Sequence, residues 1–169
     1  AGIGGTVAAK FASEGYHSCL CRRSDQEGLD RLVKGIEDEG GSANGYLINA
    51  IEDNVIEDLI NTIESDIGPI DVVVYNLGAQ TGMKLLKDTT HKEFEWGWRM
   101  ASLGLFRVAK VLCPIMKERG KGTILVTSAT AAMRGNATQH SHAAAMGARR
   151  MLCQSLNAEF SASGIHVAH

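Results

Sequence analysis

The stretch that decides the fold is VVVYNLGA, residues 72–79, together with a second stretch, TILVTSA, at residues 123–129. Each is a run of apolar, mostly β-branched residues that ends abruptly in small or polar residues. Runs of this kind form the buried strands of parallel sheets, and such sheets bind ligands at the carboxyl ends of their strands. We therefore expect a ligand site where these two strands end.

Outward from these two strands, strand and helix patterns alternate along the chain. The expected strands cover residues 17–22, 45–49, 71–75 and 122–127, and the expected helices cover 7–12, 25–39, 56–63, about 91–118 and 140–161. This alternation predicts an α/β fold with a doubly wound, largely parallel sheet. The length of 169 residues predicts a single domain over residues 1–169.

The two ends of the chain suggest that it is a piece of a longer domain. Residues 2–5, Gly-Ile-Gly-Gly, are typical of a strand-to-helix turn, and such a turn needs a strand before it. Residues 164–169 are typical of a strand that is cut off as it begins. We expect the first strand and the C-terminal strand region to be missing from this chain.

Composition excludes several function classes. The formal charge of −2 gives no electrostatic reason to expect nucleic acid or a membrane surface as a partner. No apolar run has membrane-spanning length. The four cysteines lack metal-ligand spacing, so we expect no metal site and four buried free thiols, which are typical of the reducing cytoplasm.

The first candidate nucleotide-binding residues are Gly2, Ile3 and Gly4, which open a helix. Free N–H groups at a helix start favour a pyrophosphate, although a glycine-rich helix start is also common in purely structural turns. The strand at 17–22 ends where a ribose-binding carboxylate is expected, and here Arg22 and Arg23 follow instead. Two guanidinium groups without an acid suit a 2′-phosphate and predict NADP rather than NAD. The alternative is a solvated basic loop.

Two further strand ends complete the candidate cofactor site. Asn49 and Ala50 follow the strand at 45–49, where an asparagine binds an adenine edge or serves only as a turn residue. Asn76, Leu77 and Gly78 follow the strand at 71–75 and form a small turn that allows close approach of a nucleotide.

At this point the chain resembles the short-chain dehydrogenases/reductases. Residues 2–4 match the end of the family's TGxxxGIG motif, residues 75–78 match its NNAG motif, and residues 164–167 resemble the segment that leads into its sixth strand. The resemblance implies a Rossmann-type, three-layer fold and a nicotinamide cofactor. It also implies homodimers or homotetramers built on the two long helices, about 91–118 and 140–161.

The resemblance fails at the family's chemistry, which uses Asn, Ser, Tyr and Lys. These four positions fall on Ala101, Ala129, His142 and Met146. No tyrosine follows Tyr75, so a shift in alignment does not restore the acid. His142 is the one replacement that titrates near neutral pH, which makes it a candidate general acid/base. The alternative is a histidine near a dimer or pocket surface.

Two functions from different classes follow from this pattern. The first is an oxidoreductase that transfers hydride between NADP(H) and a small carbonyl or alcohol substrate, with atypical acid/base residues. The second is a catalytically inactive nucleotide-binding protein that acts through its dimer surface, which Ala101, Ala129 and Met146 favour.

Overall fold

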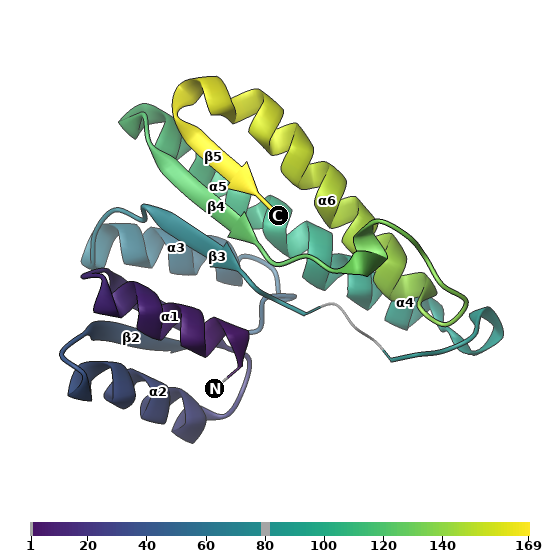
Figure 1. Ribbon diagram of the computed structural model, residues 1–169, viewed down its shortest axis with the longest axis horizontal. Helices are drawn as coiled ribbons and strands as arrows, with labels where there is room; N and C mark the ends of the chain where they lie inside the picture. The colour runs from purple at the N-terminus through teal and green to yellow at the C-terminus, as the bar shows by residue number, and fades with distance from the viewer. Residues whose placement is uncertain (1, 79–81) are drawn as a thin grey trace. The chain divides into compact units, whose positions relative to one another are not determined.

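The strands form two parallel sheets in a computed structural model that describes residues 2–78 and 82–169 (Figure 1). Contacts divide the chain into two compact units, residues 1–52 and 53–169, and each unit contains one of the sheets. The expected α/β class, with parallel strands and helical crossovers, is confirmed. The expectation of one domain over residues 1–169 stays a prediction.

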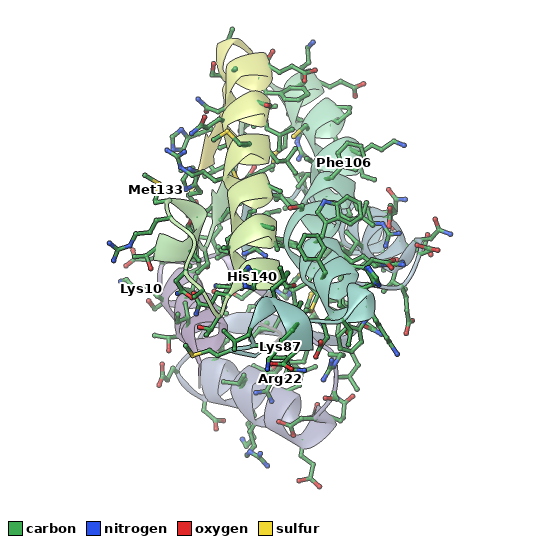
Figure 2. The ribbon with its side chains drawn as sticks, turned by 90° about the vertical axis from the view of Figure 1, so that its right-hand side faces the viewer. Lys10, Arg22, Lys87, Phe106, Met133 and His140 are labelled. Atoms are coloured by element: carbon green, nitrogen blue, oxygen red, sulfur yellow. The ribbon has the colours of Figure 1, made fainter. Side chains whose placement is uncertain are left out.

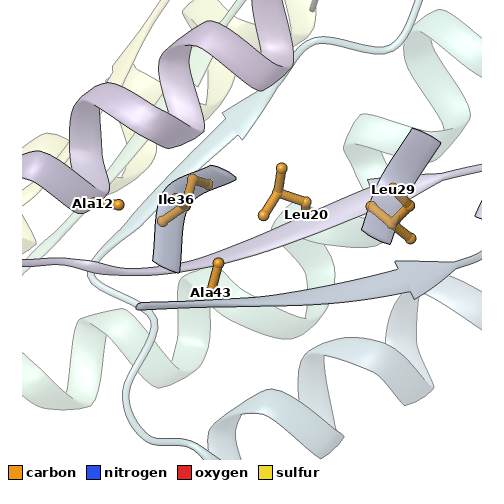
Figure 3. Close-up of a cluster of buried hydrophobic side chains, with 5 residues drawn as sticks. All are labelled: Ala12, Leu20, Leu29, Ile36 and Ala43. Atoms are coloured by element: carbon orange, nitrogen blue, oxygen red, sulfur yellow. The ribbon is translucent and has the colours of Figure 1, made fainter. Parts of the chain in front are cut away.

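The first unit is a two-stranded sheet with two helices. Its elements are α1 (Ile3–Ser13), β1 (His17–Arg22), α2 (Gln26–Asp38) and β2 (Ser42–Leu47). β1 and β2 pair in parallel, and the ladder begins with His17 opposite Ser42. This pairing explains why β2 begins earlier than the expected strand at 45–49. The core consists of the buried side chains of Ala12, Leu20, Leu29, Ile36 and Ala43 (Figure 3).

Alternation along β1 corrects the expectation that all four cysteines are buried. Ser18 and Leu20 are buried on the core side of the strand, whereas Cys19 is half-buried and Cys21 is exposed. Successive side chains of a strand point to opposite faces, so a core-facing Leu20 turns both cysteines away from the core. All four cysteines are free thiols, and Cys113 and Cys153 are buried as expected.

The second unit is a three-stranded parallel sheet with strand order β3-β4-β5. Its strands are β3 (Val72–Tyr75), β4 (Gly122–Val126) and β5 (Ile165–Ala168). Val74 lies opposite Leu125, and Ile124 lies opposite Val167. Its longer helices are α3 (Val55–Asp66), α4 (His91–Trp98), α5 (Gly104–Arg119) and α6 (His140–Phe160), with short 3₁₀ turns at η1 (Leu86–Asp88), η3 (Thr130–Ala132) and η4 (Ser161–Ser163). α6 runs beside β5 and α5 packs against β4 (Figure 1).

The long helix expected at 91–118 is interrupted by a π-helical turn. α4 ends at Trp98, the π-helical turn η2 covers Arg99–Leu103, and α5 continues from Gly104 to Arg119. A π turn inserts one residue into the hydrogen-bond ladder and leaves carbonyls that other groups must bind. Hydrophobic periodicity does not reveal such a turn, because the residues on both sides keep a helical pattern.

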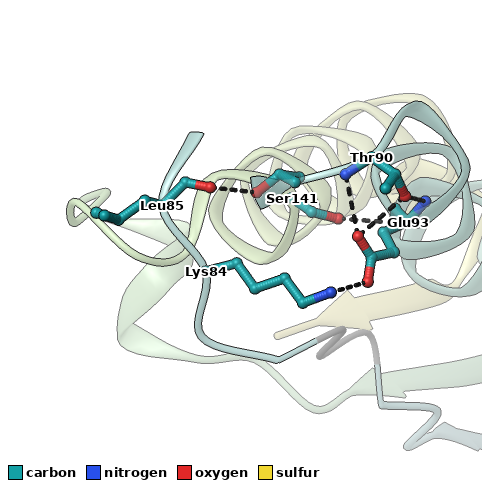
Figure 4. Close-up of polar contacts among 6 residues, drawn as sticks. Lys84, Leu85, Thr90, Glu93 and Ser141 are labelled. Carbon is teal, nitrogen blue, oxygen red and sulfur yellow. Dashed lines mark hydrogen bonds and ion pairs between the residues drawn. The ribbon is translucent and has the colours of Figure 1, made fainter. Parts of the chain in front are cut away.

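A polar network holds the segment before α4 against the start of α6 (Figure 4). Thr90 and Glu93 form a capping box, in which the Thr90 Oγ1 accepts from the Glu93 N–H at 3.2 Å and the Thr90 N–H donates to Glu93 Oε2 at 3.0 Å. Lys84 forms an ion pair with Glu93, and the Ser141 hydroxyl donates to the Glu93 carbonyl at 3.0 Å. Glu93 therefore links three segments of the second unit.

Within residues 2–78 and 82–169, no helix combines the length and apolarity that a membrane span requires. The same residues contain no cluster of three or more His, Cys, Asp or Glu side chains that could hold a metal ion. The cytoplasmic location inferred from the thiols stays a prediction.

The Glu93 network predicts an acid-dependent loss of stability. The Lys84 ammonium and the Thr90 N–H and hydroxyl lower the pKa of Glu93 from 4.5 to about 2. A lowered pKa in the folded state stabilises the fold above pH 4.5, and this contribution is lost as the pH falls toward about 2. Thermal melts should show Glu93→Gln less stable than wild type at pH 7, with the gap closing below pH 4.5. Glu118→Gln, on an exposed position of α5, is the charge-matched control, and a gap that does not change with pH would contradict the network's role.

Candidate nucleotide-binding and catalytic site

The two strands that decide the fold end side by side. Thr127 follows β4, and its N–H donates to the Tyr75 carbonyl at 3.1 Å. The Thr127 hydroxyl donates to Asn76 Oδ1 at 2.6 Å. Asn76 thus uses its side-chain oxygen to join the two strand ends. Leu77 is half-buried and Gly78 is exposed, and a Cβ added at Gly78 would meet only open space.

Beneath these strand ends lies a buried arginine from α6. Arg149 is 2% exposed and donates hydrogen bonds to three backbone carbonyls. Its Nε donates to the Ala101 carbonyl at 3.0 Å, its Nη1 to the Thr127 carbonyl at 3.0 Å and its Nη2 to the Leu77 carbonyl at 2.7 Å. No carboxylate in the described part of the chain pairs with it, and burial lowers the pKa of its guanidinium. One side chain therefore joins the ends of β3 and β4 to the π-helical turn.

Tyr75, the last residue of β3, binds the same π turn. Its hydroxyl donates to the Met100 carbonyl at 2.5 Å, and the Arg149 guanidinium lies 5.1 Å from its ring centroid. Burial raises the pKa of Tyr75 to about 12, so the phenol stays a neutral donor. Tyr75 and Arg149 together bind two consecutive carbonyls of η2, those of Met100 and Ala101, which explains why the helix tolerates a π turn here.

Three of the four positions aligned with the family's catalytic residues come together as an apolar cluster. Ala101 and Met146 are 0% and 3% exposed and pack with Ala145, and the partly buried Ala129 packs against them. His142, one turn before Met146 on α6, is half-buried. Its Nδ1 is buried and has no hydrogen-bond partner among the described residues. Among the four aligned positions, His142 therefore carries the only ionisable side chain.

Hydroxyl-bearing residues flank Ala129, the position aligned with the family's serine. Ser128 and Thr130 are both exposed, on either side of the half-buried Ala129. Ser128 precedes Ala129 in an extended segment, and successive side chains of such a segment point to opposite faces. The Ser128 side chain therefore points away from the side that Ala129 faces.

The remaining candidate cofactor residues lie in the first unit. Gly2 and Ile3 are exposed at the start of α1, and a Cβ added at Gly2 would meet only open space. Gly4 is the second residue of α1, so its N–H belongs to the first turn, whose N–H groups lack helical acceptors. Asn49 donates to Glu52 Oε1 at 2.8 Å, and Ala50 is half-buried.

The two arginines after β1 differ in their surroundings. Arg22 Nη1 donates to Asp25 Oδ2 at 2.5 Å, so an acid does lie next to the predicted phosphate site. Arg23 is exposed and makes no hydrogen bond or ion pair to the described residues.

Sequence reasoning missed the roles of Arg149 and Asp25. The signal for Arg149 is its place on the stripe of α6 that also carries Met146 and Cys153, an apolar stripe on which an arginine has to find partners. The signal for Asp25 is an acid three residues after Arg22, directly before a helix, where aspartate is a favoured cap.

Comparison with known proteins identifies the family. The family profile described as short chain dehydrogenase matches residues 1–169. A 3-oxoacyl-[acyl-carrier-protein] reductase of Thermotoga maritima is 29% identical over 145 residues, which is 85% of this chain and 57% of the relative. A short-chain dehydrogenase from Rhodopseudomonas palustris superposes with a TM-score of 0.93 at 31% identity, covering 99% of this chain and 77% of that one.

A second similar solved structure contains a bound cofactor. It is a gluconate 5-dehydrogenase from Burkholderia cenocepacia in complex with NADP and tartrate. It is 27% identical to this chain, with a TM-score of 0.88, and the match covers 99% of this chain and 66% of that one.

The chain belongs to the short-chain dehydrogenase family, and its fold is of the Rossmann type found in that family. Its named relatives are oxidoreductases. The chain spans between 53% and 62% of the length of the first four curated relatives it matches.

The contact between Tyr75 and η2 requires a glycine at position 104. A Cβ at Gly104 would collide with the Tyr75 hydroxyl, so Gly104→Ala should destabilise the protein by about 1–3 kcal/mol. Tyr75→Phe removes the colliding oxygen, so the double variant should lose less stability than the sum of the two single variants. Urea unfolding measures all three. The control is Gly147→Ala on α6, where a Cβ meets open space and no loss is expected.

The buried arginine should be essential to the second unit. Arg149→Met removes one donor from each of three backbone carbonyls, and we expect a loss of at least about 2 kcal/mol, since the loss of a hydrogen bond to a buried group costs about 1–3 kcal/mol and relief of the buried charge offsets part of it. Arg150→Met, the next residue on α6, is the control, and urea unfolding of both measures the difference. An Arg149→Met protein as stable as Arg150→Met would refute the role of these bonds.

Proposed function

We propose that this chain is the nucleotide-binding part of an oxidoreductase that transfers hydride between NADP(H) and a small carbonyl or alcohol substrate. The observation that carries the proposal is the pairing of β3 and β4, which brings their carboxyl ends together next to an exposed Gly78. The relative solved in complex with NADP supports the choice of cofactor.

The residues present fit a dinucleotide phosphate. In the first unit, the open space around Gly2 allows close approach of a ligand to the backbone, and the first N–H groups of α1 suit a pyrophosphate. In the second unit, the backbone at Gly78 is open in the same way. The exposed Arg23 suits a 2′-phosphate. When bound, NADP(H) supplies the hydride chemistry. This chain's residues would bind and orient it.

The proton would be handled by His142. It is the titratable residue among the four aligned positions, and its buried Nδ1 lacks a partner among the described residues. Ala101, Ala129 and Met146 are apolar and supply no ribose-binding amine. Loss of the usual acid/base group lowers rates by about 10²–10⁴-fold, so we expect a slow enzyme.

A second candidate function is nucleotide binding without turnover. The apolar cluster at the aligned catalytic positions favours it. The surface of the long helices fits a role in self-association, because large apolar side chains are exposed there, as Phe106 illustrates (Figure 2). These side chains are Phe94, Trp96, Trp98, Phe106 and Met151. We propose a homodimer or homotetramer through α4, α5 and α6.

Fluorescence titration with NADPH and NADH tests the cofactor. We expect NADPH to bind about tenfold tighter, equivalent to about 1.4 kcal/mol, and Arg23→Ala to remove most of this preference. Lys34→Ala, an exposed cation further along α2, is the control and should change neither affinity. Absence of binding to either nucleotide would overturn the oxidoreductase proposal. Equal affinities for NADPH and NADH would overturn the proposed preference for NADP(H).

Turnover then separates the two functions. With a panel of small carbonyl substrates, NADPH oxidation that disappears in His142→Ala and persists in His140→Ala supports the enzyme. NADPH binding without oxidation above background across the panel supports the inactive nucleotide-binding protein.

A further inference from the structure

The acid that faces Arg22 is held in a defined geometry. Arg22, which is labelled in Figure 2, is the last residue of β1. Asp25 is the N-cap of α2 and has a left-handed backbone conformation with φ of 72°. The two oxygens of Asp25 have different partners. Oδ1 accepts from the Gly28 N–H at 2.9 Å, and Oδ2 accepts from Arg22 Nη1 at 2.5 Å. The carboxylate is thus fixed to the helix on one side while it binds the guanidinium on the other.

Gly28 makes room for this ion pair. It is buried in the first turn of α2, and a Cβ there would collide with both the Asp25 carboxylate and the Arg22 guanidinium. The pair is therefore part of the way β1 connects to α2.

The ion pair changes the charge presented at the end of β1. The Gly28 N–H and the Arg22 guanidinium lower the pKa of Asp25, which keeps the carboxylate ionised. Its negative charge offsets the positive charge of Arg22. Arg23, exposed and without a partner among the described residues, keeps its full charge for a ligand.

We propose that Asp25 is a specificity-determining residue whose carboxylate competes with a 2′-phosphate for Arg22, so that Arg23 makes the stronger phosphate contact. This inference rests on the proposed function, since it assigns roles within the proposed NADP site. It predicts that the chain prefers NADPH less strongly than two free arginines would allow.

Removal of the Asp25 charge tests the proposal. Asp25→Asn keeps an oxygen for the Gly28 N–H and loses the negative charge. Calorimetric titration should show 2′,5′-ADP and NADPH binding about three- to tenfold tighter than to wild type, as expected for one charge removed at a partly exposed site. Binding of 5′-AMP and NADH, which lack the 2′-phosphate, should not change. Asp30→Asn, an exposed acid on α2, is the charge-matched control and should not change any affinity.

The two arginines should differ in the same titration. Arg23→Ala should weaken 2′,5′-ADP binding more than Arg22→Ala does. Asp25→Ser, which also offers a cap oxygen, replaces Asp25→Asn if a thermal melt shows that the asparagine variant is unfolded.

The outcomes separate this inference from the proposed function. Suppose that wild type binds the nucleotides and that Asp25→Asn leaves the 2′,5′-ADP affinity unchanged or weaker. The proposed competition between Asp25 and the 2′-phosphate for Arg22 is then wrong, and the proposed NADP site is unaffected. If Arg22→Ala weakens 2′,5′-ADP binding as much as Arg23→Ala does, the assignment of the stronger phosphate contact to Arg23 is wrong. If no variant binds any of the four nucleotides, the proposed function fails and the inference fails with it.

Discussion

A buried arginine is the interaction on which the second unit depends. A guanidinium removed from water needs acceptors for its N–H groups, and Arg149 finds them in the carbonyls of Leu77, Ala101 and Thr127. These carbonyls follow β3, lie in the π turn and follow β4, so they belong to segments far apart in the chain. Because the acceptors are neutral, none of the three can move away without leaving part of a buried charge unsatisfied.

The same arginine explains how the apolar cluster and the π turn coexist. Within the π turn, the carbonyl of Met100 accepts a hydrogen bond from the Tyr75 hydroxyl, and that of Ala101 accepts one from the Arg149 Nε. Ala101 is then buried against Met146 without a polar side chain of its own. The hydrogen bonds of Tyr75 and Arg149 beneath the strand ends therefore hold the packing of the second unit together. Of the four positions that align with the family's catalytic residues, His142 is the one with an ionisable side chain.

The first unit arranges charge in a different way. Its ion pair between Arg22 and Asp25 lies at the surface, and its importance comes from geometry rather than from stability. A cap at the start of α2 fixes the carboxylate, and the arginine that ends β1 is thereby paired. Neighbouring arginines in the sequence thus differ in the charge that they offer to a ligand.

The sequence by itself determined the α/β class, the alternation of strands and helices and most of their boundaries, because these follow from local hydrophobic period and from glycine and proline positions. It also identified the strand ends at Asn76 and Thr127, since an apolar run that stops at polar residues is a local pattern. Tertiary structure decided which backbone carbonyls Arg149 binds, where the long helix becomes a π turn and which face of β1 lies against the core. Those features depend on groups that meet only when distant segments pack together, and no local pattern records the partner that a buried donor will find.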